Sequence, residues 1–283
     1  MINRLLDKRI PKLLGISLVA FSVILISVFI RNPTFFKSNA ITIEDPQNIT
    51  ITNMSDTSFS LSYTTETSIT ATVSFGKDTS LGFTEIEDMD KEKGTISPRI
   101  IHATTLKNLT PNTKYYFVIN SGQTTFLNNN APFEVITGPS ISAFATQTPI
   151  SGKVILPNVS IPTTTIAYLT IKGAQTLSTL VKKDGSFIFQ LDFLRSEDLS
   201  SFFSLDKDSN IKIAFVNDFF ASRVLSSYSK TNPLPTLTLP NDYDFTIDSS
   251  IPIATTSGGI GGFQEILPSP SLSKNTGTLA PII

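Results

Sequence analysis

Short runs in which apolar and hydroxyl-bearing residues alternate constrain the fold of this chain more than any other feature. Residues 59–63 alternate Phe, Leu and Tyr with Ser, and residues 71–75 alternate Ala, Val and Phe with Thr and Ser. Residues 49–52 repeat the pattern with Ile and Thr. A period of two with β-branched partners is typical of a half-buried β-strand. We therefore expect an all-β protein whose hydroxyl-rich strand faces meet solvent.

Turn-forming residues separate these runs. They are Asn53, Asp56, Gly76, Asp78, Gly94, Pro98, Pro111 and Asn112. Several short strands with turns between them indicate a β-sandwich. Residues 109–117 read LTPNTKYYF. This spacing predicts a tyrosine corner, in which Tyr115 points inward and its hydroxyl bonds backbone a few residues upstream.

The stretches SDTSFSLSYTTE, ATVSFG and HATTLKNLTPNTKYYFVINSG lie within residues 45–138. Together they resemble a fibronectin type III domain, and more narrowly the domain at the N-terminus of purple acid phosphatases. The resemblance implies an immunoglobulin-like sandwich. Tyr63 departs from it, because the family usually has a core tryptophan there, and a tyrosine fills that space well if its hydroxyl reaches a partner.

The resemblance does not imply that this chain has phosphatase activity. In those enzymes the metal ligands lie in a separate catalytic domain that follows the sandwich. Such a site needs several His and Asp ligands, whereas this chain has a single histidine, His102, inside the sandwich region. Function belongs to the site rather than to the fold.

Residues 149–240 contain a second set of strand-like runs. PISGKVI spans 149–155, TIAYLTI spans 165–171 and IKIAFV spans 211–216. Asp184-Gly185 between two apolar runs predicts a β-hairpin. The order of SGKV, a Pro-rich loop, AYLTI and DGSF resembles carboxypeptidase regulatory-like domains, which implies a transthyretin-like β-sandwich. Residues 139–148 would then link the two sandwiches.

The N-terminal segment predicts one transmembrane helix. Residues 13–30 form an uncharged apolar run, which as a helix would span ~27 Å of a hydrocarbon core ~30 Å thick. A buried core helix is the alternative. Residues 1–12 carry four basic side chains, so the positive-inside rule places them in the cytoplasm and the rest of the chain outside.

We expect this segment to remain as a single-pass anchor in the cell membrane, followed by a linker at 31–44. The run is longer than the ~7–15 residues of a signal-peptide core. The nearest small-residue site, Ser38-Asn39-Ala40, lies well beyond the run. Cleavage there is the alternative and would give a secreted protein.

Two further segments have a less specific pattern. Residues 241–283 are rich in Ser, Thr, Pro and Gly, which predicts a flexible tail. The Gly-rich stretch 257–262 lacks the preceding strand and the Lys-Ser/Thr ending of a phosphate-binding loop. Residues 194–205 fit either a loop or a short helix with Ser196 as its N-cap.

We expect no enzyme activity, cofactor or metal. The chain has no cysteine and a net charge of −1, which excludes thiolate chemistry and gives no field that attracts nucleic acid. His102 lacks a recognisable nucleophile, so a structural role at a strand edge is expected. Asp206, Asp208 and Asn210 have a calcium-loop spacing, but the Gly and Glu of an EF-hand are missing, which favours a solvated turn.

One stretch concentrates acidic side chains. It contains Glu85, Glu87, Asp88 and Asp90, followed by Lys91 and Lys93. Mixed charges in a loop usually mean solvation, and a weak cation contact is the alternative.

These features favour a membrane-anchored extracytoplasmic protein that acts as a structural or binding module. Its loops or sheet edges would contact a polysaccharide or another surface protein. The alternative is a non-catalytic accessory portion of an exported hydrolase, such as a metallophosphoesterase, whose catalytic domain is absent from this chain.

Overall fold

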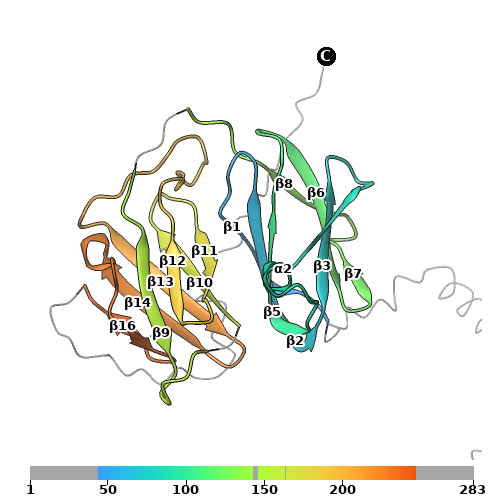
Figure 1. Cartoon of the computed structure of the whole chain (residues 1–283). Helices are drawn as coiled ribbons and strands as arrows, with labels where there is room; N and C mark the ends of the chain where they lie inside the picture. The colour runs from blue at the N-terminus through green and yellow to red at the C-terminus, as the bar shows by residue number, and fades with distance from the viewer. Residues whose placement is uncertain (1–43, 143–145, 163, 247–283) are drawn as a thin grey trace, which may run out of the picture. The chain divides into compact units, whose positions relative to one another are not determined.

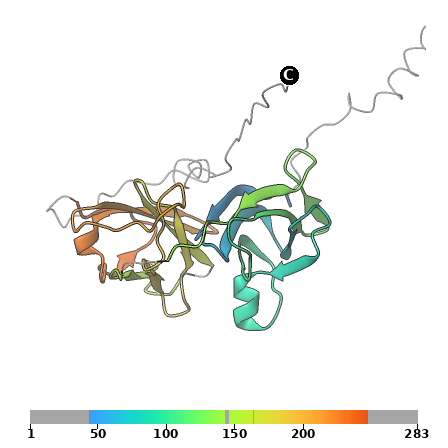
Figure 2. The ribbon, with the colours of Figure 1, turned by 90° about the horizontal axis from the view of Figure 1, so that it is seen from above.

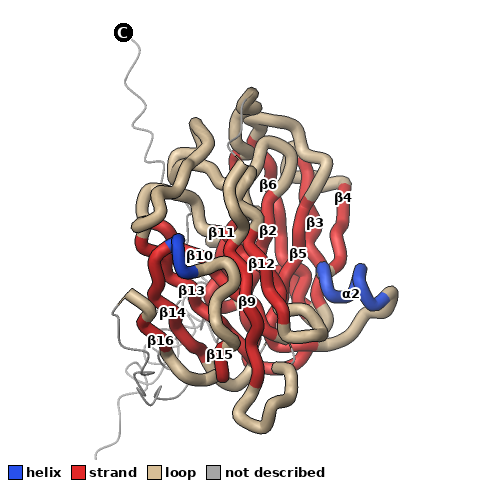
Figure 3. Tube along the Cα trace, turned by 60° about the vertical axis from the view of Figure 1, so that its left-hand side comes forward, coloured by secondary structure: helices blue, strands red, loops and turns tan. Residues whose placement is uncertain are grey.

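The computed structural model describes residues 44–142, 146–162 and 164–246, and β-strands dominate this part of the chain (Figure 1). Its helices are α2 (Asp88–Lys93) and the 3₁₀ turn η2 (Tyr228–Lys230) (Figure 3). The prediction of an all-β architecture with tandem sandwiches is confirmed. Within the described residues no helix is long and apolar enough to cross a membrane. The predicted membrane segment 13–30 and residues 247–283 of the predicted tail lie outside them. The tail prediction is wrong for residues 241–246, because strand β16 (Tyr243–Asp244) pairs with β14 of the second sandwich.

The first sandwich packs a three-stranded sheet against a larger one. The smaller sheet has the order β1-β2-β5, all antiparallel, with β1 (Gln47–Thr52), β2 (Phe59–Ile69) and β5 (Arg99–Leu106). The larger sheet has the order β4-β3-β6-β7, and β8 also pairs with β6. Its strands are β3 (Ala71–Gly76), β4 (Phe83–Ile86), β6 (Lys114–Ser121), β7 (Thr124–Phe126) and β8 (Phe133–Ile136).

The alternating residues fill the core between these sheets. Phe59, Leu61 and Tyr63 point inward from β2, and Val73 and Phe117 meet them from the opposite sheet. Each fully buried side chain of this size contributes about 1.5–3 kcal/mol of transfer free energy. The alternation at 59–63 and 71–75 therefore marks the core faces correctly.

The predicted tyrosine corner is present. The backbone N–H of Thr110 donates to the hydroxyl of Tyr115 at 2.9 Å, and Tyr115 is buried. The second sandwich repeats the arrangement with the same spacing, since the N–H of Thr238 donates to the hydroxyl of Tyr243 at 2.8 Å. In both places the tyrosine hydroxyl accepts a hydrogen bond from a backbone N–H group five residues earlier in the chain, and this bond closes the bend.

The second sandwich also consists of two sheets, seen as separate layers from above (Figure 2). One has the order β11-β10-β13-β14-β16 and the other the order β12-β9-β15. The strands are β9 (Ile150–Ile155), β10 (Thr165–Ile171), β11 (Leu177–Leu180), β12 (Ser186–Phe189), β13 (Asn210–Asn217), β14 (Ala221–Ser227), β15 (Leu237–Thr238) and β16 (Tyr243–Asp244). A cluster that includes Phe187, Phe189 and Phe215 fills its core.

The predicted hairpin at Asp184-Gly185 is wrong. A tight turn does form, because Gly185 has φ 82° and its N–H donates to the carbonyl of Lys182 at 2.9 Å. However, β11 pairs with β10 and β12 pairs with β9, so the turn carries the chain from one sheet to the other. A turn signal is local and does not specify whether the flanking strands pair or face each other across the core.

Residues 194–205 form a loop rather than a helix. Arg195 and Phe202 make an isolated bridge that closes it. The N–H of Ser201 donates to the hydroxyl of Ser196 at 3.2 Å. Ser196 therefore accepts a backbone hydrogen bond, as expected of a cap, but within a closed loop.

Candidate functional site

The outer face of the β1-β2-β5 sheet is buried, and the expectation that its hydroxyl groups meet solvent is wrong. Thr52 and Ser62 are 2% and 1% exposed. The hydroxyl of Ser62 hydrogen-bonds the hydroxyl of Tyr168 at 2.8 Å, and that of Thr52 bonds Ser178 at 2.6 Å. Tyr168 and Ser178 belong to the second sandwich, which covers this face. Alternation identifies the two faces of a strand but does not show what covers the second one.

An apolar cluster joins the two sandwiches beside these hydroxyl pairs. It contains Ile101 from β5 and Ile166, Tyr168, Ala214 and Val216 from β10 and β13. The other faces of β10 and β13 fill the core of the second sandwich. Both strands are therefore buried on both sides, which explains why their sequences read as nearly continuous apolar runs.

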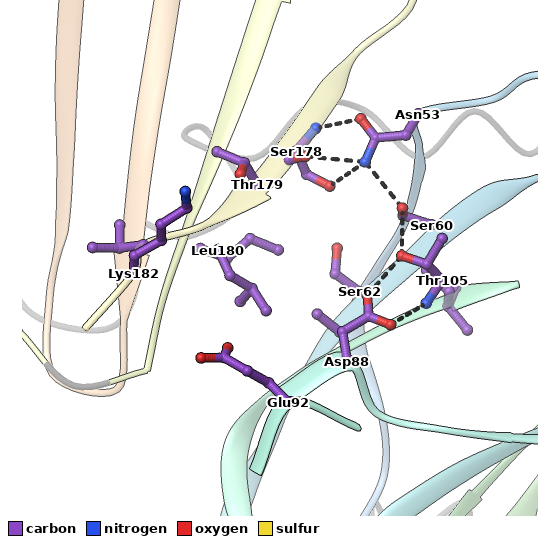
Figure 4. A pocket seen from close by; sticks show the side chains of 14 residues that line it. Asn53, Ser60, Ser62, Asp88, Glu92, Thr105, Ser178, Thr179, Leu180 and Lys182 are labelled. Carbon is purple, nitrogen blue, oxygen red and sulfur yellow. Dashed lines mark hydrogen bonds between the residues drawn. The ribbon is translucent and has the colours of Figure 1, made fainter. Parts of the chain in front are cut away.

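Asn53 forms hydrogen bonds to the second sandwich at one edge of this contact. Its backbone N–H donates to the carbonyl of Thr176 at 3.2 Å. Its side-chain amide donates to the carbonyl of Ser178 at 3.0 Å and accepts from the N–H of Ser178 at 2.9 Å. Asn53 has φ 52°, a left-handed conformation in which asparagine is enriched. The amide thus imitates a peptide group and continues the edge of β11 (Figure 4).

A cavity of about 320 Å³ lies in the contact. Along one wall, the hydroxyl of Ser60 bonds that of Thr105 at 3.0 Å. The Asp88 carboxylate accepts from the N–H and the hydroxyl of Thr105 at 3.1 and 2.6 Å (Figure 4). Leu180 and Ile166 line it as well. A cavity of this size, with polar and apolar walls, suits ordered water or a small polar molecule.

Sequence reasoning did not find this cavity. Its lining comes from three separate stretches, residues 53–62, 88–105 and 166–182. None of them contains a motif that indicates a ligand, and only the packing of one sandwich on the other brings them together.

A second cluster, of charged side chains, is buried inside the first sandwich. Glu87 and Asp90 are each 1% exposed. Arg99 forms ion pairs with both carboxylates, and Glu87 also contacts His102. The expectation of a solvated mixed-charge loop is therefore wrong for Glu87 and Asp90. Arg99 and His102 lie on β5, and the sequence does not show that β5 runs beneath α2.

The outer part of the acidic stretch behaves differently. Lys91 pairs with Glu85 at 2.9 Å and with Asp88 at 3.0 Å, and all three side chains are partly exposed. Asp206 and Asp208 are exposed in a turn closed by the N–H of Ser209 donating to Asp206. Within residues 44–142, 146–162 and 164–246, no group of three His, Asp or Glu side chains is arranged to hold a metal ion.

His102 lies on the edge strand β5 but is fully buried. Its Nδ1 contacts Glu87, its Nε2 hydrogen-bonds the hydroxyl of Thr65 at 3.0 Å, and its ring stacks on Tyr63 with centroids 4.6 Å apart. Burial, together with the Arg99 charge, lowers the pKa of His102 to about 3. The neutral imidazole thus ties α2 to the sheet.

Tyr63 occupies the place where the resembled family has tryptophan. Its hydroxyl is buried and makes no hydrogen bond within the described residues. Burial raises the pKa of Tyr63, and the nearby Arg99 charge opposes that rise. The ring therefore fills the core without the partner that sequence analysis expected for its hydroxyl.

Comparison with known proteins identifies the first sandwich. Residues 45–135 match the family model of the purple acid phosphatase N-terminal domain. This confirms the resemblance for that region, which is less than half of the chain. The family of the second sandwich is not identified in this way, and no curated protein matches the chain.

Solved structures align with parts of the chain at low similarity. The sensor domain of the anti-sigma factor RsgI4 of Pseudobacteroides cellulosolvens is 11% identical with a TM-score of 0.27, covering 36% of this chain and 100% of that one. PhoD is 12% identical with a TM-score of 0.25, covering 38% and 21%. The FN1-FN3 domains of chicken CNTN1 are 13% identical with a TM-score of 0.22, covering 64% and 66%.

The buried His102 makes stability depend on pH. Its pKa is about 3 in the folded state and ~6.5 in the unfolded state, so between these values the unfolded chain binds the extra proton. Stability should therefore fall as pH drops below 6.5, by about 2 kcal/mol between pH 7 and pH 5 from this group. Urea unfolding at the two pH values measures the loss, and a His102→Gln variant should show a smaller one.

An NMR titration gives an independent readout that needs no variant. The chain has one histidine, so its imidazole signals are unique. They should stay constant from pH 7 to pH 5 in the folded protein. A ring signal that titrates near pH 6.5 would contradict the account.

Proposed function

We propose that this chain is a non-catalytic, membrane-anchored module that holds a rigid pair of β-sandwiches outside the cytoplasmic membrane for structural or binding purposes. The observation that carries the proposal is the mutual burial of the two outer sheet faces around Ile101, Tyr168 and Val216. Domains joined by a linker alone move independently, whereas apolar side chains buried between two domains oppose that motion. A rigid pair suits a spacer or a binding platform.

Polar contacts near the linker support the same proposal. Arg195, which is 3% exposed, donates from its guanidinium to the carbonyl of Pro139 at 2.7 Å. Its other terminal nitrogen lies 3.4 Å from a carboxylate oxygen of Asp56. Arg195 thus connects the second sandwich with the first and with the start of the linker.

The N-terminal part of the proposal rests on the sequence of residues 1–30. The uncharged run 13–30 follows a basic flank, and this order favours a cytoplasmic N-terminus with the sandwiches outside. We further propose that the second sandwich is a carboxypeptidase regulatory-like domain. The SGKV sequence in β9 and the DGSF sequence at the turn before β12 support that assignment.

The proposed partners are a polysaccharide or another surface protein. Among the described strands β4 lies at the end of its sheet and pairs with β3 alone. An open strand edge can accept an extended segment of a partner by strand addition.

The alternative function is a non-catalytic accessory portion of an exported hydrolase such as a metallophosphoesterase. The match of residues 45–135 to the purple acid phosphatase N-terminal domain favours it. The mass of the protein isolated from its source separates the two proposals. The accessory portion predicts a polypeptide larger than the 30.8 kDa of this sequence, and the self-contained module predicts that mass.

Rigidity can be tested by placing a charge in the contact. Ala214 is 3% exposed and faces the first sandwich from β13. An Ala214→Glu change would bury an unpaired carboxylate there, which is costly, so the sandwiches should separate while each core stays folded. Small-angle scattering should then show a larger radius of gyration.

Leu225→Glu is the matched control. Leu225 lies on β14, beside β13 in the same sheet, pairs with Lys212, and is 41% exposed. This variant should scatter like the parent protein. Equal scattering from parent and Ala214→Glu, with both folded, would show that the contact does not fix the pair.

Topology can be tested with single cysteines, because the natural sequence has none. A Thr79→Cys variant, at an exposed turn of the first sandwich, should react with a membrane-impermeant maleimide in intact cells. An Asn3→Cys variant should react only after lysis. Protection of Cys at position 79 until lysis would rule out the extracytoplasmic placement.

A further inference from the structure

Val159 has a backbone conformation that is unusual for a β-branched residue. It has φ 65° and is 72% exposed. Its N–H donates to the carbonyl of Leu156 at 2.8 Å, which fixes the turn. A β-branched residue in this left-handed conformation is a genuine outlier, and glycine or asparagine would be expected. The exposed side chain makes little packing contact that could offset the strain.

Phe219 is an unusually exposed aromatic residue in another turn. It is 78% exposed, the highest value among the exposed large apolar side chains of the described residues. It lies in the connection 218–220 between β13 and β14, which is closed by the N–H of Asn217 donating to the carbonyl of Phe220 at 2.9 Å. Exposed turns most often contain Gly, Pro, Asn, Asp or Ser. A phenylalanine at this position is costly to expose and is not required by the turn.

The two turns project from the same end of the second sandwich. The side-chain amide of Asn217 donates to the carbonyl of Thr164 at 3.3 Å and to the hydroxyl of Thr165 at 2.9 Å. The turn 217–220 therefore lies beside the start of β10, where the loop that contains Val159 ends. We call the exposed side chains Val159 and Phe219, at this end of the sandwich, the apolar tip. Lys182 and Lys183 are exposed in the turn after β11, and this turn leaves from the same end because the N–H of Val181 donates to Thr165.

The chain enters the described part near this tip. Gln47 at the start of β1 pairs with Thr64, Thr64 pairs with Ile101, and Ile101 packs in one cluster with Val216, the residue before Asn217. Two strand spacings and one sheet-packing distance make a path of about 20 Å. The start of β1 and the turn between β13 and β14 both lie toward the lower edge of Figure 1.

The sequence limits how far the predicted bilayer segment can lie from the start of β1. The segment ends at residue 30, and the 13 residues 31–43 that follow can extend by at most about 45 Å. The outer surface of that bilayer is thus within reach of the apolar tip. Exposed apolar side chains suit a lipid interface, where they enter the headgroup region, and the ammonium group of the exposed Lys182 can stay in water beside them.

We propose that the apolar tip docks on the outer surface of the bilayer that holds the anchor, with Val159 and Phe219 entering the headgroup region. This inference rests on the proposed membrane anchoring and adds a second attachment to it. The docked tip would set the tilt of the rigid sandwich pair relative to the membrane.

The test is made on the full chain reconstituted into phosphatidylcholine–phosphatidylglycerol vesicles. The natural sequence has no tryptophan, so a Phe219→Trp variant provides a single emitter at the tip. Its emission should shift to the blue, and lipids brominated near the headgroup should quench it at least twofold. The matched control is Phe193→Trp. Phe193 is 61% exposed in the loop after β12, at the other end of that sandwich, and a tryptophan there should not be quenched.

A second variant tests the strained turn. Val159→Gly added to Phe219→Trp should relieve the left-handed strain and raise the thermal unfolding midpoint, while it weakens the quenching. Vesicle flotation separates the two proposals. A chain that does not float contradicts the anchor and removes the basis of the docking. A chain that floats with no quenching of Phe219→Trp leaves the anchor standing and overturns the docking.

Two other outcomes also overturn the docking. One is equal quenching at positions 219 and 193, which indicates non-specific adsorption. The other is a blue shift without bromine quenching, which indicates that a second protein copy rather than lipid covers the tip.

Discussion

The two sandwiches are held together by the burial of sheet faces that each would expose if it folded alone. The contact combines an apolar cluster around Ile101 and Val216 with hydroxyl pairs such as Ser62 with Tyr168. Burial of the apolar side chains is favourable, and the hydrogen bonds satisfy groups that would otherwise be costly to bury. The cavity, the proposed rigidity of the pair and the proposed orientation at a membrane all depend on this contact.

The core of the first sandwich could be predicted from the sequence because its rules are local. Alternation at 59–63 selects the inward residues, and the spacing before Tyr115 specifies a corner that the structure confirms. The family match of residues 45–135 agrees with the same motifs. These features act over a few residues, so a single sequence contains enough information to specify them.

The features that sequence analysis missed depend on contacts between distant residues. Glu87 and Asp90 read as solvated charges, and only the fold shows that Arg99 on β5 pairs with both carboxylates and that the neutral His102 contacts Glu87. Asp184-Gly185 reads as a hairpin, and only the sheet pairing shows that its strands lie in different layers. The alternating pattern predicted that the hydroxyl-bearing face of the β1-β2-β5 sheet is exposed to solvent. The pattern is the same whether water or a neighbouring domain covers that face.

The rigidity of the sandwich pair is the central claim, and a distance distribution between the two domains tests it most directly. Since the chain has no cysteine, spin labels can be placed on cysteines introduced at the exposed positions Thr79 and Lys207, one in each sandwich. Double electron–electron resonance on the otherwise unchanged protein should give one narrow distance peak. A broad distribution, spanning the range that a free linker allows, would contradict the account.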